Sequence, residues 1–177
     1  MENTALLIID VQQGLFGPTP MPYNALTVVN NINILIAKAR TKNIPIIFIQ
    51  HEDAQELRYL SDNWQLYSLI NASSNDYVVR KTTPDSFNHT ELSKIMQKLN
   101  ITHCVICGYA TEFCIDTSTR QAAVLNYAVT LVNDAHTTHD KNHLDAAKII
   151  QHHTISLSSM TSFSVPIIAK PTQDIEF

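Results

Sequence analysis

The stretch Thr4-Ala-Leu-Leu-Ile-Ile-Asp10 is a nearly pure apolar run that ends on an acid, and it decides the fold class. A strand covered by helices on both faces loses the alternation of apolar and polar residues, so this run predicts a buried strand. Similar runs follow at residues 44–50 and 102–108, and amphipathic stretches lie between them at 24–42 and 90–99. This alternation indicates βαβ units. We therefore expect an α/β fold, a three-layer α/β/α sandwich with a mostly parallel sheet of five or six strands.

The remaining elements are expected from the same patterns. Further strands are predicted at residues 76–81 and 127–133, with a short last strand at 154–157. Further helices are predicted from 108 to about 126 and over 141–153. Two segments, 14–22 and 51–75, are expected to be irregular, and the second carries Trp64.

Composition limits the function classes. The chain has 177 residues, 45% hydrophobic and 16% charged, which suits one domain over 1–177. Twelve basic residues against sixteen acidic ones, with no basic run, argue against a nucleic-acid partner. No apolar run reaches 18 residues and the start lacks the features of a signal peptide, so we expect no membrane partner. The odd count of three cysteines suggests free thiols and a cytoplasmic location.

The candidate site lies at the carboxyl ends of the predicted strands, where open α/β sheets bind their ligands. Asp10 ends the first strand, Lys81 ends the third, and Cys114 follows the fourth by a few residues. Thr111 is expected to cap the next helix, which places Cys114 in its first turn. There the helix amides and a nearby Lys81 favour a thiolate. Asp10 is the candidate proton acceptor for this thiol.

Four motifs extend this pattern over most of the chain. They are Leu-Leu-Ile-Ile-Asp-Val-Gln at 6–12, Lys81 with Asp85-Ser-Phe87, Gly108-Tyr-Ala-Thr-Glu-Phe-Cys114 and Asp134-Ala-His-Thr-Thr-His-Asp140. In order and spacing the chain resembles the isochorismatase-like cysteine hydrolases, a superfamily that includes nicotinamidases and N-carbamoylsarcosine amidases.

The resemblance implies a function and a site. Asp10, Lys81 and Cys114 match the catalytic triad of the family, and Tyr109–Ala110 matches its non-proline cis peptide. The amides of Ala110 and Cys114 would form the oxyanion hole. The implied activity is that of a cysteine hydrolase that cleaves a C–N, amide-type bond of a small molecule through a thioester on Cys114. The resemblance also suggests a homo-oligomer, a dimer or higher.

The chain departs from the zinc-dependent nicotinamidases. Those enzymes carry an aspartate and a histidine two residues apart after the second strand, whereas this chain has Gln50-His51-Glu52-Asp53 there. We therefore expect no metal and no cofactor, although His51 and the histidines at 136, 139 and 143 are possible ligand types. Family members that cleave the vinyl ether of isochorismate lack the cysteine, so Cys114 favours the amide-hydrolysing branch.

Alternatives remain open at this stage. The chain could be a non-catalytic small-molecule binding module, an isochorismatase-type vinyl ether hydrolase, or an aspartate-based phosphohydrolase that would need magnesium. Cys104 and Cys107 lie three residues apart in one predicted strand, so they point to opposite faces and are expected to be buried and structural. The three histidines are expected to be exposed or capping. The substrate wall is expected to contain aromatic rings, namely Phe16, Trp64, Phe87 and Tyr109.

Overall fold

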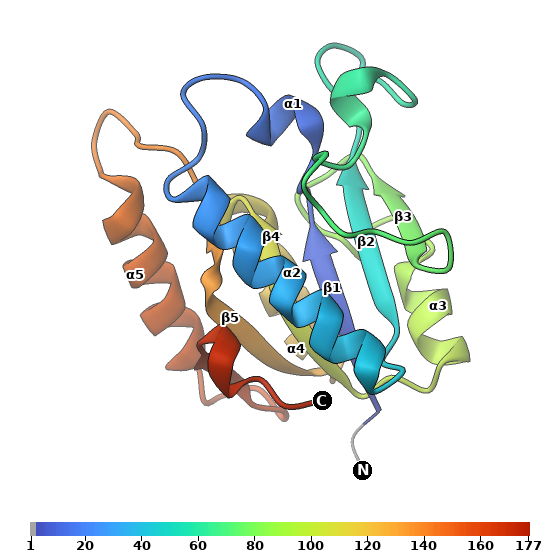
Figure 1. The fold of residues 1–177 in the computed structure, drawn as a ribbon. Coiled ribbons are helices and arrows are strands. Elements are labelled where there is room, and N and C mark those ends of the chain that lie inside the picture. Colours follow the sequence, from blue (N-terminus) through green and yellow to red (C-terminus); the bar gives the residue numbers. More distant parts are fainter. Residues whose placement is uncertain (1–2) are drawn as a thin grey trace.

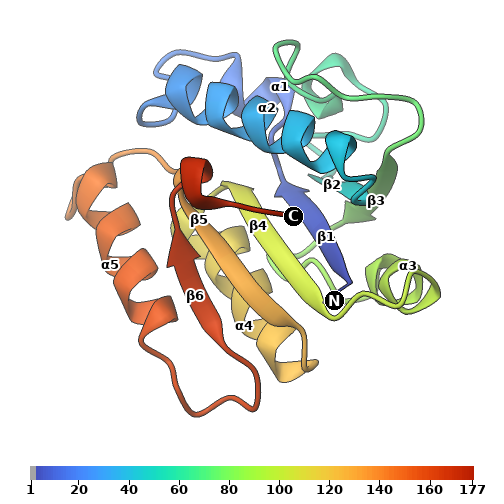
Figure 2. The ribbon, with the colours of Figure 1, turned by 60° about the horizontal axis from the view of Figure 1, so that its bottom comes forward.

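The computed structural model describes residues 3–177; Met1 and Glu2, the first residues of the expected 1–177 domain, lie outside the described residues. One sheet contains six strands, which are β1 (Thr4–Ile9), β2 (Ile46–His51), β3 (Tyr77–Lys81), β4 (His103–Tyr109), β5 (Ala128–Thr137) and β6 (Ile167–Lys170). Their order is β3-β2-β1-β4-β5-β6, and all neighbouring strands pair in parallel (Figure 1, with β6 labelled in Figure 2). The predicted α/β sandwich is confirmed, with six strands.

Helices cover both faces of the sheet. They are α1 (Gln13–Phe16), α2 (Ala25–Thr41), α3 (Leu92–Lys98), α4 (Asp116–Val124) and α5 (Ala146–Ser158), with one-turn segments at Asp62–Trp64, Thr111–Ile115 and Thr172–Asp174. The long helix α2 lies on one face, and α3, α4 and α5 pack on the other (Figure 2). Among the described residues, no helix has both the length and the apolar character that crossing a membrane requires.

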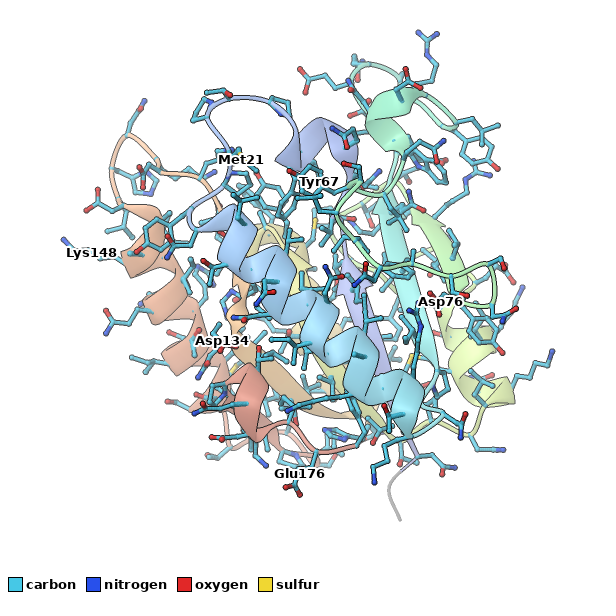
Figure 3. All side chains as sticks on the ribbon, in the orientation of Figure 1. Met21, Tyr67, Asp76, Asp134, Lys148 and Glu176 are labelled. Atoms are coloured by element: carbon cyan, nitrogen blue, oxygen red, sulfur yellow. The ribbon has the colours of Figure 1, made fainter. Side chains whose placement is uncertain are left out.

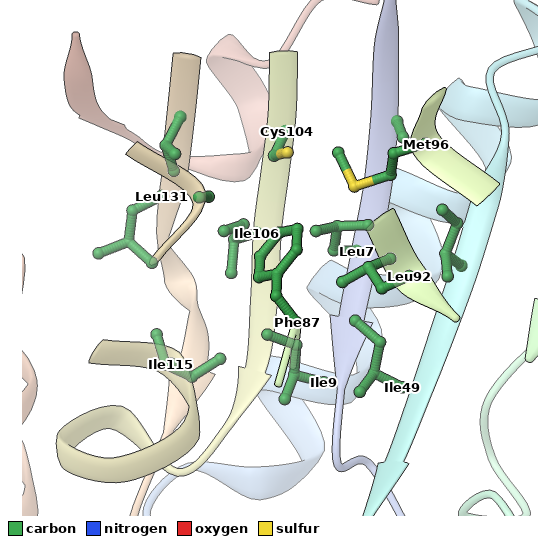
Figure 4. Packing of buried hydrophobic residues seen from close by; sticks show 14 of the residues in the cluster. Leu7, Ile9, Ile49, Phe87, Leu92, Met96, Cys104, Ile106, Ile115 and Leu131 are labelled. Atoms are coloured by element: carbon green, nitrogen blue, oxygen red, sulfur yellow. The ribbon is translucent and has the colours of Figure 1, made fainter. Parts of the chain in front are cut away.

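The two faces of β1 explain its unbroken apolar sequence. Leu6 and Ile8 belong to the core under α2, whereas Leu7 and Ile9 belong to the core on the opposite face. Figure 4 shows the second core, where Leu92 and Met96 of α3 approach the sheet. Every residue of β1 is buried, because both of its faces are covered by helices.

The paired cysteines of β4 divide between these two cores. Cys104 is fully buried in the cluster with α3 and α4, and Cys107 is fully buried in the cluster with α2. Burial raises the pKa of both thiols well above the ordinary value. The prediction of two buried cysteines on opposite faces of one strand is confirmed.

β1 and β4 are parallel neighbours at the middle of the sheet. The strands that follow β1 in the chain extend the sheet to one side, and those that follow β4 extend it to the other, so the strand order reverses between them. The carboxyl ends of these strands point toward α1 and the segment after β2 (Figure 1). Met21 and Tyr67 lie at this end (Figure 3), and both pack on the core under α2. The site expected from the sequence falls at this switch point.

Two elements differ from expectation. Residues 154–157 form the end of α5 instead of a last strand, and the sixth strand is Ile167–Lys170. Thr154-Ile-Ser-Leu157 has the β-branched residues typical of strands, but Leu157 is fully buried on the helix face that covers the core, and this packing outweighs local propensity. β5 also continues to Thr137, beyond the expected end at residue 133, and thereby buries His136.

Candidate active site

Asp10 stands directly after β1 and is held by the backbone. Its amide donates to the carbonyl of Ile49 on β2 at 2.8 Å, and its backbone is left-handed, with φ of 54°. Aspartate tolerates this conformation better than most side chains. The side chain is 2% exposed. The carboxylate is therefore fixed and dry at the carboxyl end of the central strand.

Lys81, the last residue of β3, reaches the same point from two strands away. Its Nζ donates to Asp10 Oδ2 at 2.7 Å, to the Thr83 carbonyl at 3.2 Å and lies 3.3 Å from His51 Nδ1. None of its side chain is exposed. Burial alone would lower the pKa of Lys81, but the charges of Asp10 and Cys114 outweigh it and raise the pKa. Lys81 is therefore a cation at neutral pH.

Cys114 completes the cluster from the segment after β4. Residues Thr111–Ile115 form one turn of π-helix that runs into α4, and Lys81 Nζ donates to the Cys114 sulfur at 3.2 Å. The three residues singled out in the sequence thus meet around one ammonium group. They come from the residue after β1, the last residue of β3 and the turn after β4.

The protonation state of Cys114 differs from expectation. Burial, followed by the charge of Asp10, raises the pKa of the thiol to about 12, and Lys81 only partly offsets this. The expected thiolate is therefore wrong for the free protein. Sequence reasoning weighed the cation and the helix end but had no measure of burial. Asp10 Oδ1 is buried without a hydrogen-bond partner among the described residues, so it has a lone pair available for the thiol proton.

The turn also begins differently from expectation. Thr111 is not its N-cap; Ala110 takes that position, and no side chain caps the turn. The Thr111 hydroxyl instead lies 2.8 Å from Nδ1 of His136, because both side chains are buried between β5 and the turn. The Tyr109–Ala110 peptide bond is cis, as the family resemblance implied. The Ala110 amide has no acceptor among residues 3–177, so it is available to a ligand oxygen.

The aromatic residues expected at the substrate wall have separate places. Trp64 borders a hollow of about 520 Å³ beside the outer edge of β3, which Lys81 also borders. Phe16 is fully buried and packs on Tyr109 at 5.9 Å between ring centroids. Phe87 lies in the core (Figure 4), stacked on Tyr127. The expectation that Phe87 lines the substrate wall is therefore wrong. Phe87 follows the end of β3 closely in the chain, but its ring packs in the core with residues of α3.

Two glutamines that sequence reasoning left without a role organise the rim. Gln12 is fully buried; its amide donates to the carbonyls of His51 and Trp64 at 2.9 Å each and accepts from the His51 amide at 2.8 Å. Gln50 donates to the same Trp64 carbonyl at 2.7 Å. The sequence signal for both residues was a polar side chain at the end of an apolar run, which is Thr4–Asp10 for Gln12 and 44–50 for Gln50. These bonds fix the segment that carries His51 and Trp64.

The donor set does not fit the metal of the zinc-dependent relatives. Gln50 is turned to a backbone carbonyl and His51 Nδ1 faces the Lys81 ammonium. Among residues 3–177 no three His, Cys, Asp or Glu side chains gather in a way that could hold a metal ion. The histidines after β5 are also apart: His136 is buried, His139 bonds to the Tyr109 hydroxyl at 2.9 Å, and His143 is exposed. The expectation of an exposed or capping residue is therefore wrong for His136.

The fold and the site together define an α/β protein with a buried acid, a buried lysine and a half-buried thiol at the switch point of its sheet. The sequence profile of the Isochorismatase domain matches residues 4–162. The chain therefore belongs to the isochorismatase family.

Individual relatives agree with this assignment. A crystal structure of an isochorismatase family protein superimposes with a TM-score of 0.87 at 36% identity, covering 96% of this chain and 99% of that one. A streptothricin hydrolase of Streptomyces noursei is 30% identical over 77% of this chain, which spans about half the length of that relative. Nicotinamidase 3 of Arabidopsis thaliana is 24% identical over 76% of this chain and 73% of its own length.

Proposed function

We propose that this protein is a cysteine hydrolase that cleaves the C–N bond of a small amide-type substrate through a thioester on Cys114. The observation that carries the proposal is the position of Lys81 Nζ, a buried group that lies 2.7 Å from Asp10 Oδ2 and 3.2 Å from the Cys114 sulfur. A buried carboxylate beside a half-buried thiol has the arrangement of a base and a nucleophile. Their shared cation, the Lys81 ammonium, holds the two groups next to each other.

The first half of the reaction forms the thioester. The Cys114 sulfur attacks the substrate carbonyl while its proton passes to Asp10, whose Oδ1 lacks another partner. The carbonyl oxygen becomes an oxyanion, which the amides of Ala110 and Cys114 would bind. The C–N bond then breaks, and Asp10 returns the proton to the leaving nitrogen. The raised pKa of Cys114 implies that the proton moves when substrate is bound.

The second half consumes water. A water molecule attacks the thioester carbonyl, Asp10 accepts its proton, and the same two amides would hold the second oxyanion. Breaking the C–S bond releases the carboxylic acid, and the proton goes back to the Cys114 sulfur. Throughout both halves Lys81 stays protonated and orients Asp10.

The choice of an amide over a vinyl ether is supported by two observations. The Lys81 ammonium contacts both the Cys114 thiol and the Asp10 carboxylate. This arrangement suits a reaction in which the thiol is the nucleophile, and cleavage of a vinyl ether does not use one. The relative of Arabidopsis thaliana is named as a nicotinamidase, an amide-cleaving activity. A non-catalytic binding module is the alternative, and the thioester distinguishes it.

The test is a search for that thioester. The purified protein is mixed with simple amides, N-carbamoyl compounds and hydroxamates, quenched in acid within seconds and weighed intact by mass spectrometry. We expect a mass increase equal to the acyl group, located on the Cys114 peptide, together with release of the amine. Cys114→Ala is the matched variant, and Cys107→Ala is the control for a thiol that lies outside the site. Turnover that persists in Cys114→Ala would refute the proposal.

A further inference from the structure

The turn that carries Cys114 is short, and its side chains connect it to the rest of the fold at two places. Glu112 accepts from Thr138 at 2.9 Å and pairs with Lys141 at 3.0 Å near the surface, and Thr111 makes the buried connection. Thr111, the first residue of the Thr111–Ile115 turn, is fully buried, and its Oγ1 lies 2.8 Å from His136 Nδ1. Thr111 follows Ala110 directly, so whatever restrains Thr111 also restrains the Ala110 amide. The same turn places the Cys114 sulfur three residues later.

His136 is held on both sides of its ring. It stands on β5, where it pairs with Gly108 of β4, and it is 1% exposed. Its Nε2 lies 3.1 Å from Oγ1 of Thr154 on α5. The hydroxyl–imidazole–hydroxyl chain therefore links the turn, the sheet and α5. Burial lowers the pKa of His136 to about 4, so the ring is neutral at pH 7, with one donor and one acceptor nitrogen to match two hydroxyls.

We propose that His136 is a positioning residue for catalysis: through Thr111 it holds the Ala110 amide and the Cys114 sulfur in the relative places that acyl transfer requires. This inference rests on the proposed function. It differs from a general packing role, because the contact toward Thr111 restrains the reacting groups, whereas the contact toward Thr154 leads away from them.

Two reagents that react with the Cys114 thiol distinguish the position of the Ala110 amide from the accessibility of the thiol. With p-nitrophenyl acetate, the Cys114 sulfur attacks the ester carbonyl, its proton goes to Asp10, and p-nitrophenolate leaves as the acetyl thioester forms. This reaction passes through an oxyanion and so depends on the Ala110 amide. Alkylation by iodoacetamide displaces iodide at carbon without an oxyanion. The ratio of the two rate constants therefore reports on the geometry of the turn.

The variants are chosen to remove one contact at a time. Thr111→Val keeps the shape and deletes the hydroxyl, and we expect acylation to fall about 10-fold or more while alkylation changes less than about 3-fold. Thr111→Ser restores the hydroxyl and should restore acylation. Thr154→Val deletes the far contact and should leave the ratio unchanged. The amide of glutamine reaches the position of His136 Nε2 but has no group at that of Nδ1, so His136→Gln should keep the contact to Thr154 and lose that to Thr111. It should therefore behave like Thr111→Val and serves if that variant does not fold.

The outcomes distinguish the inference from the function on which it rests. If the wild type forms no acetyl thioester on Cys114, the proposed function fails. If the wild type is acylated and Thr111→Val lowers both rate constants in parallel, or neither, the positioning role of His136 is refuted. If Thr154→Val and Thr111→Val lower the ratio of the acylation to the alkylation rate constant by the same factor, the positioning role is also refuted. His136 would then be a packing residue.

Discussion

The ammonium of Lys81 and the carboxylate of Asp10 form an ion pair of 2.7 Å in which the two side chains are 0% and 2% exposed. The two residues belong to β3 and to the end of β1, with β2 between them. A pair buried so completely is costly to break, because the remaining partner is left as an unpaired charge without water. The site and the stability of the sheet edge are therefore linked.

Replacing Lys81 by methionine should lower the free energy of unfolding by about 3–5 kcal/mol, since it leaves Asp10 charged and unpaired. Arg80→Met is the matched control. Arg80 is the preceding residue of the same strand, and it pairs with Glu52 at 2.7 Å on the surface, where ion pairs contribute little. Urea unfolding of both variants at pH 7 measures the difference. Similar losses in the two variants would show that Lys81 is not paired as described.

The stability of the protein should fall as the pH rises above about 9. Burial raises the pKa of the Cys114 thiol from 9.0, its value in the unfolded chain, to about 12 in the folded protein. The contribution of the protonated thiol to the free energy of unfolding is therefore fully present below the unfolded pKa and is lost as the pH rises through the folded pKa. The raised pKa of Lys81 acts in the same direction at higher pH. Relative to Cys114→Ala, the wild type should lose about 1.4 kcal/mol per pH unit above pH 9. Parallel stability curves would contradict this assignment.

The rate at which Cys114 is alkylated should show how the charges of Asp10 and Lys81 act on the pKa of its thiol. Because the Asp10 carboxylate raises the pKa of Cys114 and Lys81 lowers it, Asp10→Asn should speed alkylation at pH 8 and Lys81→Met should slow it. Asp10→Asn should nevertheless abolish acyl transfer, since the base is gone. Peptide mapping after iodoacetamide treatment gives the rates, with Cys104 and Cys107 as unreactive internal references. Slower alkylation in Asp10→Asn would reverse the assignment.

Much of the fold and the core of the site could be predicted because they depend on simple local patterns. Asp10 and Lys81 stand at the ends of apolar runs, and parallel strands bring such ends to one edge. The features that were missed depend on tertiary packing. Residues 154–157 are drawn into α5 by the burial of Leu157, and the thiol of Cys114 stays protonated because of burial. Nothing local to Thr111 indicates that its hydroxyl would contact His136, 25 residues later.

The close contact of β1 and β4 beside Asp10 depends on Gly108. Gly108 pairs with Ile9 and has φ of 122°, and a Cβ there would lie 2.0 Å from the Ile9 carbonyl oxygen. Because both groups are backbone of central strands, Gly108→Ala should cost about 3 kcal/mol or more and should also abolish acylation of Cys114 by moving the Tyr109–Ala110 peptide.

Gly14→Ala is the matched control for this substitution. Its Cβ would lie 2.9 Å from the Leu57 methyl group and from Asn63 Cβ and 3.1 Å from the Asn63 carbonyl oxygen, so a surface turn and not a central strand would have to shift, and Gly14 has no positive φ. We therefore expect Gly14→Ala to lower the free energy of unfolding less than Gly108→Ala, because the contacts are less close, φ is not positive and alanine favours the helical backbone of α1. Thermal unfolding and the acetyl thioester assay on both variants decide the matter. A Gly108→Ala protein as stable and as readily acylated as Gly14→Ala would mean that β1 and β4 are not as close at Asp10 as the contact with Ile9 requires.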